Sequence, residues 1–358
     1  MLGLAHDPYS RAKMLPTLPQ QAAETPWPTT AWPEGRLEAD GPRFAALIAR
    51  AFGAQSDPLL GETHAFVAIH RGRLVAERYA KGFGPEAACP SWSKAKSITH
   101  ALVGILVGDG KIDVLQPAAV PEWKEGGDRR AEITLDLLLR MSSGLAFAEE
   151  YLPDKPSDVI EMLWGRGKDD VAHFAASFEL AHAPGAFWAY SSGTSNIVAR
   201  AASIAADVRG ADFERFMRQR LFEPLGMQTP MPKFDAAGTF IGSSFCFASP
   251  RDFARFGLLY LRDGLWEGKR LLPEGWVDYA RKPTFQQPTD QGRYGAHFWL
   301  DLAGPGSFSA NGYQGQFTVM VPERDLVLVR HGNSTTEGEV PNVKTWIKDV
   351  AECFPIGA

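Results

Sequence analysis

The chain has 358 residues, of which 45% are hydrophobic and 22% are charged, and 37 Lys and Arg against 42 Asp and Glu give a formal charge of −5. This composition is typical of a globular protein that is long enough to enclose a core and a cleft. The slight acidic excess offers no basic face for nucleic acid, and no apolar run approaches the roughly 20 residues of a membrane span.

The N-terminal part predicts an arm followed by a helix and a hairpin. Residues 1–40 hold six prolines and show no regular period, which predicts an extended arm that packs through Trp27 and Trp32. The first twenty residues carry charges where a secretory signal needs an apolar core, so we expect a cytoplasmic protein unless a signal was removed. Apolar positions 44, 47, 48 and 51 have helical spacing, and AFVAIHRGRLVAERYA predicts two strands that turn at Arg71-Gly72.

The rest of the chain changes from helical to β-rich patterns. Helical periodicity dominates residues 93–280, in ITHALVGILVGDG, ITLDLLLRMSSG, VIEMLWGRG, SNIVARAASIAAD, FERFMRQRLFEPLG and RDFARFGLLYLRDG. YGAHFWLDL, GQFTVMV and DLVLVRHG then predict strands, and VKTWIKDVAECF predicts a closing helix. We therefore expect an α+β fold in which the hairpin joins the C-terminal strands in one antiparallel sheet, flanked by terminal helices, with an inserted helical domain.

This pattern divides the chain into three expected units. They are an extended arm at 1–40, a sheet domain at 41–92 and 281–358, and a mainly helical domain at 93–280. Small-molecule sites are common where such units meet, so we expect the active site at their junction.

Cysteine and histidine spacing argues against metals and disulfides. Cys89, Cys246 and Cys353 are widely spaced, odd in number and form no CxxC, which predicts reduced structural thiols. The eight histidines form no H-x-x-x-H or H-x-E pattern, so we expect surface or capping roles for them and no metal. No P-loop and no G-x-S-x-G is present near the candidate serines, and no cofactor is expected.

The segment from Ser91 to Ser97, SWSKAKS, contains two overlapping S-x-x-K registers before the most apolar helix. Residues three apart share a helix face, so Lys96 can lie beside Ser93, or Lys94 beside Ser91. A lysine whose pKa is lowered by burial can take the proton of a serine nucleophile, and backbone N–H groups at a helix N-terminus favour an oxyanion. Periodicity leaves both registers open, and a serine that merely caps the helix is the alternative.

With this motif the chain resembles the serine β-lactamase and penicillin-binding-protein superfamily over about residues 60–350. The resemblance is to its class C-like, family VIII-type esterases and its 6-aminohexanoate-dimer hydrolases, and it implies a β-lactamase/transpeptidase-like fold. The Ser-Trp before the motif and the serine after its lysine select Ser93 as nucleophile and Lys96 as partner, with Ser91/Lys94 as fallback. ITLDLLLRMSSGL, LFEPLGM, SPRDFARFGLLYLRDG and LLPEGWV resemble family segments in the family's order.

The second family element, Tyr-x-Asn or Tyr-x-Ser, resembles Tyr190-Ser191-Ser192. It implies that Tyr190 relays a proton to the leaving group, since a phenol beside an ammonium loses a proton at moderate cost. Ser192 is then expected to contact substrate. A tyrosine that closes a turn against its aromatic neighbours is the alternative.

The third family element, Lys-Thr-Gly or His-x-Gly, is matched by Tyr313-Gln314-Gly315, where the usual cation is missing. Because that cation helps bind the carboxylate of a lactam, its absence argues against penicillin as the natural substrate. Gly315 permits close backbone approach, and the N–H of Gln316 would join that of Ser93 in an oxyanion hole. A plain hairpin turn is the alternative.

Further residues are expected around the substrate. Trp92 is expected to contact substrate together with Tyr313 and Gly315. Tyr151 and Asp154 are also candidates, because they follow the SSGL phrase, where the resembled hydrolases place residues over the acyl pocket. An ordinary capping loop is the alternative for the last two. Trp92, Trp188, Phe298 and Trp299 are candidates for the wall of the cleft, and core packing, the more frequent fate of such residues, is the alternative.

The resemblance implies a serine hydrolase that cleaves small esters or linear amides through an acyl-enzyme intermediate. β-Lactamase or D,D-peptidase activity, and a non-catalytic binding protein that keeps the fold, are the alternatives. The expected partner is a small-molecule ester or amide, without nucleic acid or membrane, and a homodimer stays open. Esters are favoured because an alkoxide leaving group demands less of its acid than an amine does.

Overall fold

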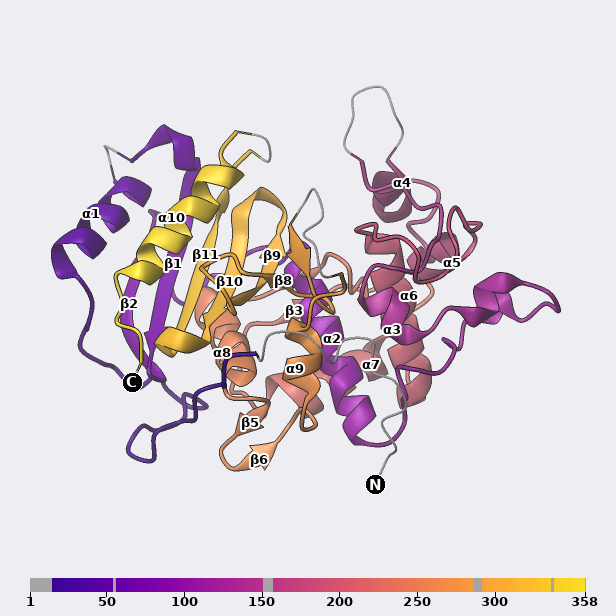
Figure 1. The fold of residues 1–358 in the computed structure, drawn as a ribbon, viewed down its shortest axis with the longest axis horizontal. Coiled ribbons are helices and arrows are strands. Elements are labelled where there is room, and N and C mark those ends of the chain that lie inside the picture. Colours follow the sequence, from indigo (N-terminus) through magenta and orange to yellow (C-terminus); the bar gives the residue numbers. More distant parts are fainter. Residues whose placement is uncertain (1–14, 54–55, 151–156, 286–291, 336–337, 358) are drawn as a thin grey trace.

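The structure is a computed structural model that describes residues 15–53, 56–150, 157–285, 292–335 and 338–357. One seven-stranded antiparallel sheet has the order β2-β1-β11-β10-β9-β8-β7, and most helices gather beside it (Figure 1). The strands are β1 (Glu62–His70), β2 (Arg73–Tyr79), β7 (Arg293–Tyr294), β8 (Trp299–Leu300), β9 (Phe308–Gly312), β10 (Gln316–Val321) and β11 (Leu326–Asn333). The sheet therefore joins the two ends of the chain, as predicted.

The N-terminal hairpin is set by its two-residue turn. Arg71 and Gly72 have φ values of 52° and 74°, the positive angles that match a tight turn to the twist of two strands. β1 then pairs antiparallel with β11, so that Val67 lies opposite Val329. The hairpin prediction is confirmed, whereas β9 was missed because its sequence FSANG carries no alternating apolar pattern.

The terminal helices α1 (Gly41–Ala51) and α10 (Val340–Glu352) cover one face of the sheet (Figure 1). Successive strand side chains point to opposite faces, so Phe66 packs with Trp346 beneath these helices while Val67 joins the main core on the other face. This arrangement confirms the sheet with flanking terminal helices.

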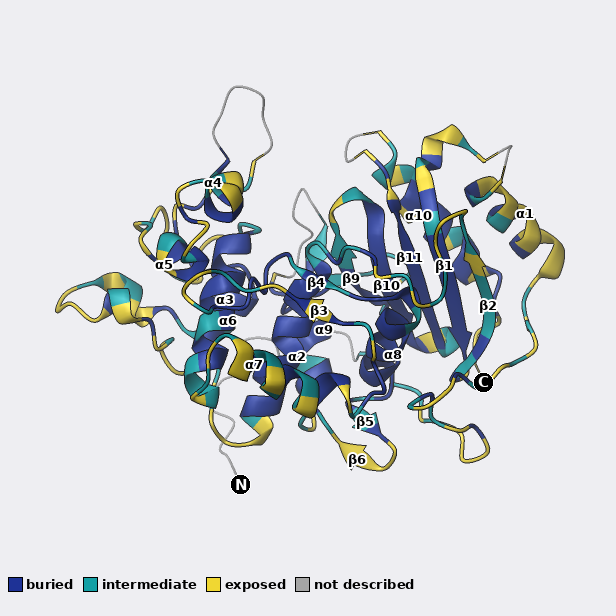
Figure 2. Cartoon of the chain, turned by 180° about the vertical axis from the view of Figure 1, so that it is seen from behind, coloured by how far each residue is buried: buried dark blue, intermediate teal, exposed yellow. Residues whose placement is uncertain are grey.

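The remaining helices lie on the other side of the sheet. They are α2 (Lys94–Gly108), α3 (Leu135–Leu139), α4 (Asp158–Trp164), α5 (Val171–Ala176), α6 (Ser192–Ala206), α7 (Ala211–Met217), α8 (Pro250–Leu261) and α9 (Trp276–Arg281). Two small two-stranded sheets accompany them, β3 (Met231–Pro232) with β4 (Cys246–Phe247) and β5 (Leu265–Trp266) with β6 (Lys269–Arg270). α2 is buried from Lys94 to Leu106, as its apolar circumference predicts (Figure 2).

Helix α8 packs against the sheet, although it falls in the range expected for the helical domain. A Cβ on its Gly257 would lie 2.7 Å from Cγ1 of Val327 in β11, so helix and strand are in close contact. The predicted division of the chain into domains at residues 92 and 281 stays a prediction. By its packing, α8 belongs with the sheet.

The described part of the arm, residues 15–40, has no helix or multi-residue strand. Trp32 is buried, and the ring of Trp27 lies 5.0 Å from that of Trp266, so both tryptophans anchor the arm. All three cysteines are free and buried, which agrees with structural thiols. No helix within the described residues is long and apolar enough to cross a membrane.

The expectation for the histidines was wrong in part. Four of them, His70, His100, His297 and His331, are buried rather than placed at the surface. Burial lowers the pKa of all four side chains below the usual value, which favours a neutral imidazole ring in the core. Spacing along the chain could not indicate this, because their partners come from distant segments.

Candidate active site

Ser93 stands immediately before α2, at the N-cap position. Its hydroxyl makes no capping hydrogen bond, so the geometry does not favour the alternative in which this serine merely caps the helix. The preceding Trp92 has φ of 44°, an uncommon angle for a bulky residue, and it turns the chain sharply into the helix. Ser93 is half-exposed, and among the described residues its N–H donates to no other backbone group.

Lys96 lies one turn into α2, with only 1% of its surface exposed. Its Nζ is 3.0 Å from Ser93 Oγ, 2.9 Å from Ser192 Oγ and 2.9 Å from the carbonyl oxygen of Ser243. Burial lowers the pKa of this amine to about 8, while the charge of Glu149 acts in the opposite direction. At pH 7 about a tenth of Lys96 is therefore neutral and able to accept a proton, and this fraction reaches one half near pH 8.

Ser192 begins α6 and connects Lys96 to a carboxylate. Its N–H donates to Glu149 Oε2 at 2.5 Å and its hydroxyl donates to Glu149 Oε1 at 3.0 Å. Ser191 caps the helix by accepting a hydrogen bond from the N–H of Thr194 at 3.2 Å, which holds Ser192 in place. The sequence analysis missed Glu149, although it lies in the FAEEY segment where the resemblance places residues near the acyl pocket.

Ser91 and Lys94, the fallback pair, form hydrogen bonds to different partners. The Ser91 hydroxyl donates to the carbonyl oxygen of Ser244 at 3.0 Å and accepts from the N–H of Cys246 at 2.9 Å. Lys94 instead directs its Nζ to Nε2 of His331 at 3.1 Å. Ser91 thus ties two buried segments together, and the geometry favours the Ser93/Lys96 register.

Tyr190 lies beside Lys96 at the end of the loop before α6. The Nζ of Lys96 is 4.8 Å from the centroid of the Tyr190 ring. The ring packs at 5.4 Å from Trp299 and 5.9 Å from Tyr294, which form a small aromatic cluster with Trp188. These rings fix the orientation of the tyrosine next to the lysine.

Phe298 does not line the cleft as the sequence analysis expected. Its ring is fully buried and lies 4.6 Å from that of Tyr260 and 5.5 Å from His100. It is therefore a core residue, which is the more common fate of phenylalanine.

The turn between β9 and β10 approaches the nucleophile from the sheet. A Cβ on Gly312 would lie 2.3 Å from the carbonyl oxygen of Ser91, so this strand end is in contact with the residues before Ser93. Gln316, which pairs with Gly312, begins β10. Trp92 contacts the same turn, because its indole N–H donates to Gln314 Oε1 at 3.3 Å.

Gly315 has φ of 80°, and a Cβ there would lie 2.5 Å from Nη1 of Arg330. The close neighbour that requires glycine is thus a buried guanidinium. Arg330 Nη1 donates to the carbonyl oxygen of Gly315 at 2.9 Å, and its other nitrogens donate to Leu60, Glu62, Thr63 and Ser334. With 1% exposure, Arg330 does not supply the cation that the third motif lacks.

Aromatic rings line the surface next to Trp92. Its ring lies 5.6 Å from that of Tyr313, 6.5 Å from Trp164 and 5.9 Å from Phe245. Tyr313 is 44% exposed and Trp164 is 55% exposed, so both rings are open to a bound molecule. Tyr151 and Asp154 lie outside the described residues.

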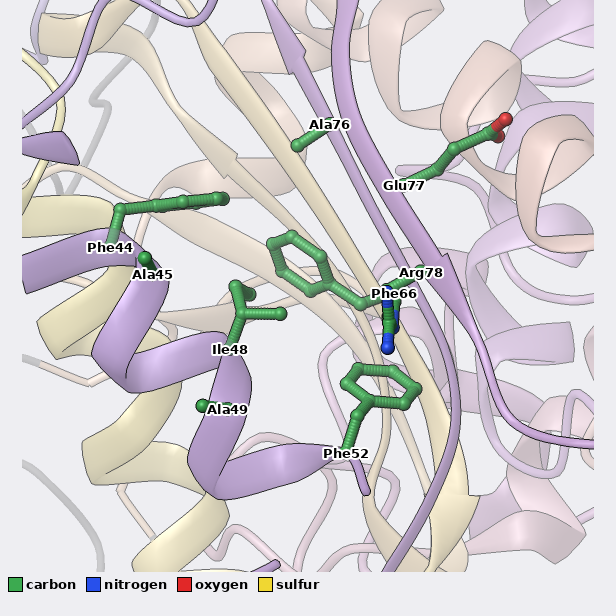
Figure 3. A pocket seen from close by; sticks show the side chains of 9 residues that line it. All are labelled: Phe44, Ala45, Ile48, Ala49, Phe52, Phe66, Ala76, Glu77 and Arg78. Atoms are coloured by element: carbon green, nitrogen blue, oxygen red, sulfur yellow. The ribbon is translucent and has the colours of Figure 1, made fainter. Parts of the chain in front are cut away.

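A separate pocket lies between α1 and strands β1 and β2 (Figure 3). It is lined by side chains that include Phe44, Phe52 and Arg78, and none of the candidate catalytic residues borders it. Among the residues that the structure describes, no group of three or more His, Cys, Asp or Glu side chains could hold a metal ion.

The chain is similar to known proteins over most of its length. A family model described as Beta-lactamase matches residues 61–352. A 6-aminohexanoate-dimer hydrolase of Paenarthrobacter ureafaciens is 26% identical over 351 residues, which cover 91% of this chain and 85% of that protein.

Solved structures show the same fold. A protein from Bacillus anthracis described as a 6-aminohexanoate-dimer hydrolase superposes with a TM-score of 0.73 at 20% identity, over 96% of this chain and 92% of that one. A family VIII carboxylesterase superposes with a TM-score of 0.67 at 14% identity, over 89% and 98% of the two chains.

Proposed function

The chain belongs to the beta-lactamase family, and we propose that it is a serine hydrolase that cleaves small esters or linear amides through an acyl-enzyme intermediate. The observation that carries the proposal is the 3.0 Å contact between the buried Lys96 amine and the half-exposed Ser93 hydroxyl. An unactivated serine is a weak nucleophile, and this contact supplies a base within hydrogen-bond reach.

In the proposed reaction Ser93 Oγ forms a bond to the acyl carbon and its proton passes to the neutral Lys96 amine. The carbonyl oxygen becomes an oxyanion, which the N–H groups of Ser93 and Gln316 would stabilise. The tetrahedral intermediate then expels the alcohol or amine, which takes a proton from Tyr190, and the Lys96 ammonium returns its proton to the Tyr190 oxygen. Water then attacks the acyl-enzyme, and one proton of that water passes through Lys96 to Ser93 Oγ as the acyl bond to Ser93 breaks, which releases the acid and regenerates Ser93.

A neutral substrate fits the surroundings of Ser93 best. Tyr313 stands where β-lactamases have a cation, and the exposed rings of Tyr313 and Trp164 offer apolar contact beside Trp92. Among p-nitrophenyl esters, nitrocefin and a linear amide dimer, we expect an ester to have the highest kcat/KM. A nitrocefin preference of more than about tenfold, or ~1.4 kcal/mol of transition-state stabilisation, contradicts this order.

Labelling of the nucleophile tests the proposal directly. A fluorophosphonate probe should form a covalent adduct that maps to Ser93 by mass spectrometry, and Ser93→Ala should remove it. Ser91→Ala is the matched control, because Ser91 is fixed by two buried contacts and should leave the labelling site unchanged. Adduct formation in the Ser93→Ala protein refutes the assignment.

Turnover distinguishes a hydrolase from a non-catalytic protein with the same fold. Wild type should hydrolyse p-nitrophenyl acetate or butyrate, and Lys96→Ala should lower kcat by at least about a hundredfold because it removes the base. Wild-type activity equal to that of Lys96→Ala would favour the non-catalytic alternative. A cytoplasmic location and a homodimer remain predictions alongside this function.

A further inference from the structure

A second lysine of the nucleophile motif is buried on the other side of the helix start. Lys94 directly follows Ser93 and is 1% exposed, yet no carboxylate contacts it among the described residues. Its Nζ lies 3.1 Å from Nε2 of His331 and 3.3 Å from the centroid of the Phe253 ring. An uncompensated buried ammonium is costly, and burial holds the pKa of Lys94 well below its usual value.

The hydrogen bonds around Gln316 determine the roles of these groups. Gln316 Oε1 accepts from the N–H of Gly332 at 3.2 Å, and its Nε2 donates to the Gly332 carbonyl oxygen at 2.6 Å. The amide orientation is therefore fixed by backbone. Because Oε1 is an acceptor, Nδ1 of His331, at 3.1 Å from it, carries the hydrogen.

The tautomer of His331 then requires a donor on its other side. With Nδ1 protonated, Nε2 of a neutral ring is an acceptor, so the neutral Lys94 amine donates to it. A continuous series of hydrogen bonds leads from Lys94 through His331 to Gln316. It needs no net charge, which suits its complete burial.

We propose that Lys94, His331 and Gln316 form a buried side-chain bridge that fixes the spacing of the two oxyanion N–H groups. One of those groups belongs to Ser93, the neighbour of Lys94 in the chain, and the other belongs to Gln316 itself. Oxyanion donors act only when they lie about 2.7–3.1 Å from the developing charge, and a misplacement of about 1 Å can cost about a hundredfold in rate. All three are positioning residues through their side chains, and the inference rests on the proposed function.

Breaking the bridge from either end tests this inference. Lys94→Met keeps the length of the side chain and removes the donor, and His331→Asn keeps a donor to Gln316 in place of Nδ1 and is too short to place an acceptor where Nε2 meets Lys94. Each should lower kcat by roughly tenfold to a hundredfold with KM changed by less than about threefold. The double variant should lose no more than either single variant, because one bridge is already broken in each.

Affinity for a transition-state analogue separates this effect from general loss of structure. An alkyl boronic acid that bonds to Ser93 places an oxygen in the oxyanion hole, so its Ki should rise in parallel with the fall in kcat/KM. Tyr260→Phe is the control: it removes a buried hydrogen bond of 2.7 Å to His100 on the same helix and should lower thermal stability without changing kcat.

Three outcomes would overturn the bridge: kcat within twofold of wild type in either variant, additive losses in the double variant, or an unchanged boronate Ki beside a reduced kcat. If Lys94→Met does not fold, His331→Asn provides the same comparison. Absence of fluorophosphonate labelling at Ser93 in wild type would instead refute the proposed function.

Discussion

Lys94 and Lys96 show how two residues of one type acquire different environments within a single turn. Two positions apart on a helix correspond to about 200° of rotation, so the two side chains point in opposite directions. Lys96 reaches oxygen atoms of Ser93, Ser192 and Ser243, and Lys94 reaches an imidazole nitrogen on the sheet side. The charge on Glu149 favours the protonated form of Lys96, whereas no carboxylate acts on Lys94 among the described contacts.

Glu149 should therefore set the pH at which Lys96 becomes a base. If neutral Lys96 is required, kcat/KM rises with pH and reaches half of its plateau near the pKa of about 8. Glu149→Gln removes a charge that raises this pKa, so the midpoint should move to lower pH, by on the order of one unit. The measurement is kcat/KM for a p-nitrophenyl ester between pH 6 and 9.5.

The same substitution at the neighbouring exposed Glu150 is the control, because its charge is not among the causes of the Lys96 shift. Glu150→Gln should leave the midpoint within about 0.2 units, as expected for a screened surface charge. A midpoint that moves upward in Glu149→Gln, or that moves equally in both variants, would refute this role of Glu149.

At the scale of elements, helix α8 contacts the sheet at Gly257, where there is room for a hydrogen atom but not for a larger side chain. A Cβ on Gly257 would lie 2.7 Å from Val327 Cγ1 and 2.9 Å from Thr318 Cγ2, and both strand residues are fully buried. Intrinsic propensity favours alanine over glycine in a helix by about 1 kcal/mol. Here the overlap should outweigh it, since overpacking a core costs about 1–3 kcal/mol.

Gly257→Ala should accordingly lower the free energy of unfolding by about 1–2 kcal/mol in urea titrations. Gly108→Ala is the matched control at the end of α2, where the nearest atom is Pro273 Cδ at 3.6 Å, an ordinary contact. That variant should be neutral or stabilising by up to about 1 kcal/mol. A stabilised Gly257→Ala protein would show that α8 can move away from the sheet without loss.

The elements that could be predicted from the sequence are those whose pattern is local. The apolar circumference of α2 and the alternation of the N-terminal hairpin indicated both elements directly. The segment ITLDLLLRMSSG was expected to be a longer helix than α3, which ends at Leu139, two residues before Met141 leaves the helical region with φ of 60°. Such an angle is imposed by tertiary contacts, which periodicity does not encode.

The candidate site divides in the same way. Ser93, Lys96 and Tyr190 were predicted from motif resemblance, and the Lys96 amine lies 3.0 Å from Ser93 Oγ and 4.8 Å from the centroid of the Tyr190 ring. Glu149 and the Lys94–His331 contact join segments far apart in the chain, so no local pattern indicates them. A buried histidine partner for a motif lysine can be found only once β11 pairs with β10 in the sheet and brings His331 to Lys94.

At the scale of the whole molecule, the site depends on docking between the two ends of the chain. Ser93 precedes α2 and Lys96 lies in its first turn, α6 supplies Ser192, and β10 supplies Gln316, so that no single segment contains the machinery. Neutral histidines pack at these contacts: His297 bonds the Lys96 carbonyl oxygen at 2.8 Å, His331 joins β11 to α2, and His100 stacks on Trp276 at 4.6 Å. Protonation of these histidines therefore opposes the packing of these segments against one another.

Stability should fall as pH drops below the ordinary histidine pKa of about 6.5. Burial lowers the pKa of His297 to about 3 and places those of His100 and His331 well below the usual value. Below pH 6.5 the histidines of the unfolded chain bind protons, whereas the buried histidines of the folded chain do not. The free energy of unfolding therefore rises with pH between these pKa values. Three such groups give a slope of up to about 4 kcal/mol per pH unit between pH 6 and 4.5.

Urea unfolding at pH 7.5, 6.5, 5.5 and 4.5 measures this slope. Paired carboxylates such as Glu122, whose pKa is lowered to about 2 from an ordinary value of 4.5, begin to add their own loss at about pH 5.5, so the histidine contribution stands apart between pH 6.5 and 5.5. His331→Asn should reduce the slope by about 1.4 kcal/mol per pH unit, and the exposed His182→Asn should not change it. A slope near zero between pH 6.5 and 4.5 would mean that these histidines are protonated in the folded protein, which is incompatible with their hydrogen bonds and burial.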